Sequence, residues 1–282
     1  MNIGIVGLGL IGGSMGWDLK SLGFQVLGVS RREQTCQTAI ALGIVDQASV
    51  DLSLMAAAEV VVICTPLAAI APTMEELIPH LSPAAIVTDV GSVKTPVVQA
   101  LSSLWPNFVG GHPMAGTAES GIEAAQRDLF VNRPYVITPA EATPTLAVEK
   151  VEEMARALRS HVYRCRPEDH DRAVAWISHL PVMVSSALIA ASMNELNPDI
   201  VRLAQQFASS GFRDTSRVGG GNPELGVMMA RYNRAELLRS LSIYRDCLDA
   251  LSADIEREDW QAIAQKLTAT QQARGLFLKT EE

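Results

Sequence analysis

The glycines closest to the N-terminus have the spacing of a dinucleotide-binding turn. Gly7, Gly9 and Gly12 form a G-x-G-x-x-G pattern between an apolar run and a helix-like stretch. Gly7 permits a tight turn, Gly9 lets the backbone approach a pyrophosphate, and Gly12 lets the helix pack closely on the strand. Leu10 and Ile11 begin the helix, whose free amides would face the anion. We therefore expect these residues to bind a dinucleotide; the alternative is a purely structural glycine turn.

The residues that follow the second apolar run discriminate between dinucleotides. An NAD site usually has Asp or Glu there, which accepts hydrogen bonds from the ribose 2′-hydroxyl. This chain has Ser30, Arg31 and Arg32 instead, and its first acid beyond them is Glu33. A hydroxyl and guanidinium groups bind the 2′-phosphate of NADP, which a carboxylate would repel. We expect NADP as the cofactor; the alternative is that the arginines are solvated loop residues.

Another loop is expected to pass beside the cofactor. The apolar run 60–64 is followed by Thr65, Pro66 and Leu67. In open α/β sheets, ligands bind beyond the carboxyl ends of the strands, so this loop should lie next to the glycine turn.

A histidine and a serine occupy the corresponding positions after later apolar runs. His112 lies between glycines and a proline, and its neutral imidazole could accept a hydroxyl proton while hydride leaves the same carbon. Ser92, which follows Gly91, is the expected neighbour that orients this imidazole or the substrate hydroxyl. On position alone, His112 could instead bond its own loop, and Ser92 could belong to a turn. Lys94 is expected to be a solvated residue at a helix start rather than a catalytic one.

The second half of the chain carries another histidine and a charged cluster. His179 lies in an apolar helix, where a histidine is usually a core residue. Arg213, Asp214 and Arg217 follow Gly211, and guanidinium groups beside an acid indicate a clamp for a substrate carboxylate with its own counter-ion. As a bare pattern this cluster favours a clamp no more than a structural ion pair.

The elements that must position these residues change character near residue 165. Before it, short β-branched runs alternate with helical stretches, and their continuous apolar character predicts a parallel sheet under helices. After Pro167 the pattern is helical. We therefore expect an α/β, doubly wound Rossmann-type dinucleotide-binding domain (1–165) followed by an all-α substrate and dimerisation domain (166–282). The expected strands beyond the first two are residues 60–64, 85–89, 108–110, 135–137 and 161–165.

The helical half contains the signals for dimerisation. Ala173–Asn194 is a long apolar helix candidate, which predicts deep burial. Asn233 and Glu236 have the spacing of a capping box at the start of the next long helix. That helix has an apolar seam with alternating spacings of four and three residues, formed by Leu237, Leu241, Tyr244, Leu248, Leu251 and Ile255. The seam fits a core-facing helix and a subunit interface equally well; we expect a homodimer.

Composition excludes several classes of function. The chain has 282 residues, of which 23 are basic and 31 acidic, giving a net charge of −8 that disfavours nucleic acid and anionic membranes as partners. The four cysteines show no C-x-x-C pairing, so we expect reduced thiols and no metal site. The first apolar run begins at Asn2, which predicts a cytoplasmic protein without a signal peptide. Charge or proline interrupts the apolar runs, so we expect no membrane span.

Taken together, the motifs resemble those of one enzyme family. Gly-Leu-Gly-Leu-Ile-Gly-Gly-Ser, Asp-Val-Gly-Ser-Val-Lys, Gly-His-Pro-Met-Ala-Gly, His-Leu-Pro and Phe-Arg-Asp-x-x-Arg occur in the order and spacing of prephenate and arogenate dehydrogenases. The resemblance covers essentially the whole chain. It implies removal of hydride from the ring C4 of the substrate to NADP, while the ring carboxylate leaves as CO₂.

The resemblance also implies roles for particular residues. His112 would be the catalytic histidine bonded to the C4 hydroxyl, with Ser92 beside it. Arg217 would hold the substrate carboxylate and Asp214 would be its ionic neighbour. His179 and Thr117 match pocket positions.

Two departures from the family pattern bear on the substrate. Some prephenate-selective relatives have a second histidine where this chain has Val182, and a tryptophan where it has Gly226. Loss of a donor near the side chain disfavours a keto acid relative to an amino acid. With the NADP signature, this favours arogenate, giving tyrosine, over prephenate, giving 4-hydroxyphenylpyruvate.

Two alternative functions predict different residues at these positions. A β-hydroxyacid dehydrogenase would carry a catalytic lysine on the long helix, and residues 173–194 contain none. A non-catalytic NADPH sensor would need neither His112 nor the Arg217 clamp.

Overall fold

A computed structural model describes residues 1–117 and 119–278. The chain divides into two compact units, Met1–Arg234 and Ala235–Glu282. Strands occur only in the first unit of the described chain, and the last of them ends at Arg164. The expected boundary at residue 165 therefore coincides with the change from strands to helices, and as a domain boundary it stays a prediction.

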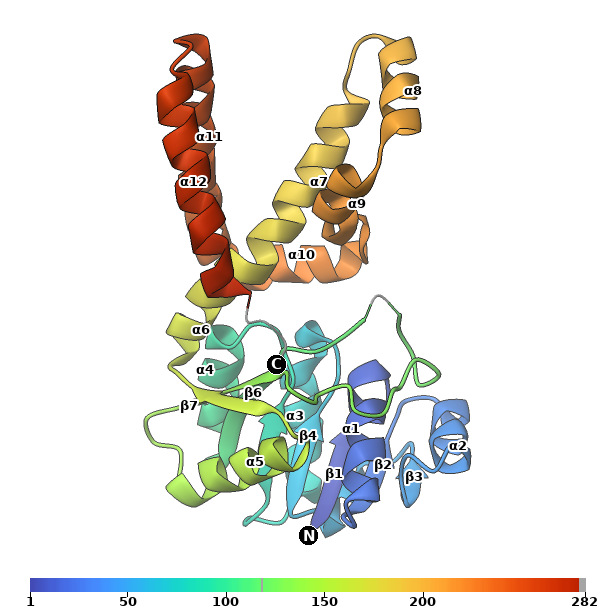
Figure 1. The fold of residues 1–282 in the computed structure, drawn as a ribbon. Coiled ribbons are helices and arrows are strands. Elements are labelled where there is room, and N and C mark those ends of the chain that lie inside the picture. The colour runs from blue at the N-terminus through green and yellow to red at the C-terminus, as the bar shows by residue number, and fades with distance from the viewer. Residues whose placement is uncertain (118, 279–282) are drawn as a thin grey trace. The chain divides into compact units, whose positions relative to one another are not determined.

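The first unit contains one sheet of eight strands in the order β3-β2-β1-β4-β5-β6-β7-β8 (Figure 1). The strands are β1 (Asn2–Val6), β2 (Gln25–Val29), β3 (Gln47–Ser49), β4 (Val60–Ile63), β5 (Ile86–Asp89), β6 (Phe108–Pro113), β7 (Pro134–Pro139) and β8 (His161–Arg164). The order reverses between β1 and β4, which is the switch point where a doubly wound sheet binds its ligand. This arrangement confirms the doubly wound α/β class.

The last two strands, β7 and β8, run against the expected direction. β7 pairs with β6 in antiparallel fashion, whereas β7 and β8 are parallel. Parallel neighbours need a crossover connection, usually a helix. The described part of the connection 114–133 consists of turns and irregular backbone and contains no crossover helix. The chain therefore enters β7 from the same end of the sheet at which β6 finishes.

Helices cover both faces of this sheet (Figure 1). Alternate strand residues face opposite cores: Ile3 and Ile5 belong to one, and Val61 and Ile63 to the other. The first core includes residues of α1 (Leu10–Ser21), α2 (Glu33–Ala41) and α5 (Thr145–Ala157). The second includes residues of η1 (Leu52–Ala57), η2 (Leu67–Ala69), α3 (Ile70–Leu77) and α4 (Thr95–Leu104), with η3 (Ile78–His80) following α3.

The rest of the described chain is helical. The elements are α6 (Pro167–Val174), the π-helical turn η4 (Ala175–His179), α7 (Leu180–Met193), α8 (Pro198–Phe207), α9 (Ser210–Ser216), η5 (Arg217–Gly220), α10 (Pro223–Tyr232), α11 (Arg234–Glu256) and α12 (Trp260–Phe277). In the second unit, Asp254 of α11 pairs with Lys266 of α12, which joins these helices. Leu248 and Ile255 of the expected seam are exposed.

The long apolar helix was expected to be deeply buried, and in the single chain it is not. In α7 only Leu180 and Ser185 are buried. The continuous helical segment Pro167–Met193 is long and apolar enough to cross a membrane by length and composition, and 28% of its most apolar window is buried. The expectation that proline interrupts this run is also wrong, because Pro181 lies in the first turn of α7, where a helix tolerates proline. Most of the apolar surface of α7 is therefore not buried within this chain.

Lys94 is the clearest departure from expectation, because it is fully buried rather than solvated. Its ammonium pairs with the buried carboxylate of Asp89 and donates to the carbonyl of Gly111 at 2.7 Å. Asp89 also accepts the amides of Gly91 at 2.8 Å and Gly111 at 3.1 Å. Burial lowers the pKa of Lys94, and the Asp89 charge opposes that shift. This network holds the ends of β5 and β6 together.

Replacing Lys94 should therefore destabilise the protein strongly. Lys94→Met leaves the buried Asp89 unpaired, and we expect the free energy of unfolding to fall by about 3–5 kcal/mol. Denaturant unfolding measures this loss. The double variant Asp89→Asn/Lys94→Met should recover part of it. Lys20→Met, which breaks the partly exposed pair with Asp46, should cost only about 1 kcal/mol. Equal losses for Lys94→Met and Lys20→Met would contradict the assignment.

Candidate active site

The glycine turn joins β1 to α1 at the switch point of the sheet. Gly7 has a φ of +105°, and a Cβ there would lie 2.7 Å from the backbone of Cys64. A Cβ on Gly12 would lie 2.1 Å from the carbonyl oxygen of Gly7, so the helix packs on the turn only with glycine. Gly9 faces open space and caps α1 without a side-chain hydrogen bond. The first amides of α1, those of Leu10 and Ile11 included, are thus available to an anion.

The loop after β4 lies against this turn, as expected. A Cβ on Gly7 would approach the amide nitrogen of Thr65 to 3.0 Å. The Oγ1 of Thr65 is buried and has no hydrogen-bond partner among the described residues. Pro66 and Leu67 continue this loop into η2. A buried hydroxyl without a partner, next to an open glycine cradle, fits a dinucleotide that satisfies it.

Ser30, Arg31 and Arg32 lie next to the same turn. The amide of Gly7 donates to the carbonyl of Val29, the last residue of β2, at 2.8 Å. Ser30 follows directly, and the side chains of Arg31 and Arg32 are exposed. Guanidinium groups beyond the end of β2 are therefore free to move onto a phosphate carried by the ribose.

His112 lies near the end of β6 and contacts a residue that the sequence did not single out. Its Nδ1 is 2.8 Å from Nε2 of His170, and the rings meet edge to face with their centroids 5.0 Å apart. Nδ1 of His170 is 2.8 Å from Oδ1 of Asp171. Burial, His170, Lys94 and His179 hold the pKa of His112 well below its ordinary value of 6.5. His112 is therefore neutral at physiological pH.

His170 and Asp171 are the residues that sequence reasoning missed. They lie on α6, in a Pro-Glu-Asp-His-Asp segment whose only signal is a histidine beside an acid in the first helix after the sheet. Ser92, expected to orient His112, is partly buried in the loop between β5 and α4. The structure gives the Nδ1 of His112 to His170 instead.

His179 belongs to the same cluster. It is fully buried at the end of η4, and its Nδ1 lies 3.1 Å from Nδ2 of Asn233. Nδ2 of Asn233 also donates to the carbonyl of Asp171 at 2.7 Å, so the expected capping box is replaced by a link between helices. Because Nδ1 of His179 accepts, its Nε2 carries the proton, and this buried donor has no partner in the described structure. Burial lowers the pKa of His179 to about 4.

The remaining predicted residues are exposed. Nε of Arg213 is 3.3 Å from Oδ1 of Asp214 on α9, and these side chains are 76% and 73% exposed. Their pairing is therefore at the surface and not in the core. Arg217 is exposed at the start of η5. Thr117 is also exposed, and its Oγ1 accepts the amide of Glu119 at 3.2 Å.

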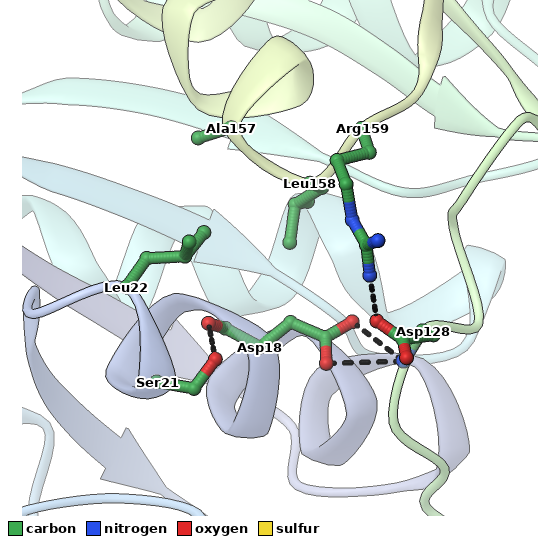
Figure 2. Close-up of a pocket in the computed structure, with 7 residues that line it drawn as sticks. All are labelled: Asp18, Ser21, Leu22, Asp128, Ala157, Leu158 and Arg159. Carbon is green, nitrogen blue, oxygen red and sulfur yellow. Dashed lines mark hydrogen bonds and ion pairs between the residues drawn. The ribbon is translucent and has the colours of Figure 1, made fainter.

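A small depression elsewhere on the first unit is closed by its own polar groups (Figure 2). Asp128 pairs with Arg159, and its amide donates to both carboxylate oxygens of Asp18 at 3.1 and 3.2 Å. These residues tie the end of α1 to the end of α5. Asp18 and Ser21 of α1 line it, so the depression begins roughly 14–18 Å along the helix from Gly9. We assign it a structural role.

Residues 1–117 and 119–278 contain no candidate metal-binding site. No group of three or more His, Cys, Asp or Glu side chains there could hold a metal ion. A dinucleotide cradle at the switch point of the sheet, with a neutral, partly buried histidine near the end of β6, indicates a dehydrogenase that depends on a nicotinamide dinucleotide.

Comparison with known proteins makes this class specific. Residues 15–164 match the model of the prephenate dehydrogenase nucleotide-binding domain, and residues 166–269 match that of its dimerization domain. The prephenate dehydrogenase of Bacillus subtilis is 32% identical over 90% of this chain and 70% of its own. The chain therefore belongs to the prephenate dehydrogenase family, which confirms the resemblance found in its motifs.

Solved structures agree with this assignment. The arogenate dehydrogenase of Synechocystis has a TM-score of 0.91 and 53% identity, covering 99% of this chain and 100% of that one. The prephenate dehydrogenase of Aquifex aeolicus, in complex with hydroxyphenyl propionate and NAD⁺, has a TM-score of 0.92 and 26% identity, covering 99% and 98%. Both the sheet and the helices after it are therefore shared with these proteins.

Proposed function

We propose that this protein oxidatively decarboxylates L-arogenate to L-tyrosine and transfers the hydride to NADP. The observation that most favours arogenate as the substrate is the 53% identity to the Synechocystis arogenate dehydrogenase over 99% of the chain. Val182 and Gly226, which stand where some prephenate-selective relatives have polar or aromatic side chains, support the same substrate.

The alternative substrate is prephenate, which would give 4-hydroxyphenylpyruvate. It is favoured by the match to the prephenate dehydrogenase family models and to the prephenate dehydrogenase of Bacillus subtilis. The two substrates share the ring and its carboxylate, so the same catalytic groups serve both.

His112 is the general base in this proposal. Its Nε2 takes the proton of the C4 hydroxyl, and loss of the ring carboxylate as CO₂ aromatises the ring. NADP, when bound, supplies the carbon that accepts the hydride. Ser92 orients the hydroxyl or the imidazole at the neighbouring strand end. The protein has only to align hydroxyl and nicotinamide and to stabilise the developing charge.

Residues on several segments would hold the cofactor and the substrate. Gly7, Gly9, Gly12 and the first turn of α1 would bind the pyrophosphate, the loop 65–67 would hold the cofactor from the neighbouring strand end, and Ser30, Arg31 and Arg32 would bind the 2′-phosphate. The unpartnered Nε2 proton of His179 serves a substrate oxygen. Arg213, Asp214, Arg217 and Thr117 complete the substrate site in the bound state.

We further propose a homodimer formed through the helical part of the chain, residues 166–282. The matched dimerization domain and the exposed apolar surface of α7 support this interface.

Initial rates of nicotinamide reduction with arogenate or prephenate, each with NADP or NAD, should be fastest for arogenate with NADP. The double variant Arg31→Ala/Arg32→Ala should raise KM for NADP by about 10–100-fold, because charge-assisted hydrogen bonds to the 2′-phosphate are lost, and should leave KM for NAD unchanged. Faster turnover of prephenate with NAD would keep the family and overturn the proposed specificity.

The pH profile follows from the lowered pKa of His112. A base must be deprotonated, and a lowered pKa extends its neutral form to more acidic pH. The charged or titratable neighbours that act on it are His170, Lys94 and His179. The acid limb of kcat against pH should therefore lie below 6.5, and His112→Gln should lower kcat by about 10²–10⁴-fold. A limb at or above 6.5 would contradict this environment.

The dimer can be tested by light scattering at micromolar concentration. We expect twice the chain mass of 30.3 kDa. Met193→Asp on α7 should shift the protein toward monomer, whereas Leu146→Asp on α5, with similar exposure (65% against 58%), should not. A wild-type monomer would remove the proposed interface.

A further inference from the structure

His170 is buried between the proposed base and a carboxylate. Only 2% of its surface is exposed, and each of its ring nitrogens has a partner at 2.8 Å. On one side lies Nδ1 of His112, and on the other lies Oδ1 of Asp171. The three side chains thus form a continuous line from the end of β6 into α6.

The carboxylate of Asp171, at one end of this line, fixes which nitrogen donates in each hydrogen bond. Asp171 accepts the amides of Lys94 at 2.7 Å and Thr95 at 2.8 Å, at the start of α4. These bonds and His170 lower the pKa of Asp171 against the opposing effect of burial, so it is an ionised acceptor. Nδ1 of His170 must then carry a proton and donate it to Oδ1.

The remaining proton positions follow from this one. A neutral histidine protonated on Nδ1 has a lone pair on Nε2, so His170 accepts at Nε2. The atom facing it, Nδ1 of His112, must therefore donate. His112 is then left with an unprotonated Nε2, the form that can accept a substrate proton.

The reverse arrangement needs an additional buried charge. If Nδ1 of His112 were the acceptor, His170 would have to be protonated on both nitrogens. That arrangement would place one more positive charge in the buried cluster, in contact with His112, which the neutral arrangement avoids. Asp89, which faces the same region, is already paired with Lys94.

We propose that His170, held by Asp171, is a positioning residue that keeps the proton of His112 on Nδ1 and leaves Nε2 free as the base. The inference rests on the proposed role of His112 in the dehydrogenase reaction. When Nε2 takes the hydroxyl proton, the O–H bond breaks and an N–H bond forms. The positive charge on His112 is then shared through its Nδ1 proton with His170, and Asp171 stabilises it.

The test separates the His112 contact from the Asp171 contact. In His170→Asn the amide can still donate to Asp171, but nothing occupies the position of Nε2. In His170→Gln the side-chain oxygen reaches that position and accepts from His112. Asp171 is unsuitable for substitution, because it also caps α4. His161→Asn, at an exposed histidine, is the control for loss of an imidazole.

Nitrogen NMR of ¹⁵N-histidine-labelled protein reads the proton positions directly, without substrate. The chain has only 5 histidines, so single substitutions assign the signals. In the wild type at neutral pH we expect His112 protonated on Nδ1 and unprotonated on Nε2. His170→Asn should move the proton toward Nε2, and His170→Gln should restore the wild-type pattern.

The kcat values of these variants should parallel their effects on the proton position. We expect His170→Asn to lower kcat about 10–100-fold with little change in KM, His170→Gln to recover most of it, and His161→Asn to match the wild type. The proposal is overturned if wild-type His112 is protonated on Nε2, or if His170→Asn changes kcat without moving the proton. If neither substrate is turned over, the proposed function fails, and the NMR result still decides the role of His170.

Discussion

The buried ion pair between Lys94 and Asp89 is the interaction on which the candidate site depends. It costs desolvation of two charges, and their mutual attraction with three further hydrogen bonds offsets that cost only in this geometry. Because the pair fixes the ends of β5 and β6 and the start of α4, it also fixes where His112 meets α6. The position of the proposed base is thus set by charges that the substrate never touches.

Much of the fold could be predicted because the deciding signals are local. The glycine turn, with Gly7 at positive φ and Gly12 against the backbone, follows from spacing alone. Continuous apolar runs correctly indicated a sheet buried on both faces. The direction of β7 could not be predicted, because it depends on whether residues 114–133 cross the sheet, and no periodicity within β7 records that.

The site was harder to predict, because its contacts join distant segments. His112 is recognisable from its place near the end of an apolar run. His170 lies 58 residues further along the chain, and its role is visible only once the fold brings it into contact with His112. Lys94 was expected at the surface, because a lysine at a helix start usually is. Its burial depends on Asp89 and Asp171, whose positions are tertiary. The apolar α7 was expected in a core, because sequence does not distinguish burial within a chain from burial by another chain.

The π-helical turn at Ala175–His179 has a consequence for how this site can change. Such a turn holds one residue more than an α-helical turn, and each residue rotates an α-helix by about 100°. Deleting a single codon here would restore a regular helix and rotate α7 about its axis relative to α6. His179 would turn away from Asn233, while His170 and Asp171 would stay in place. The turn is therefore a point where the smallest genetic change reorients an entire helix.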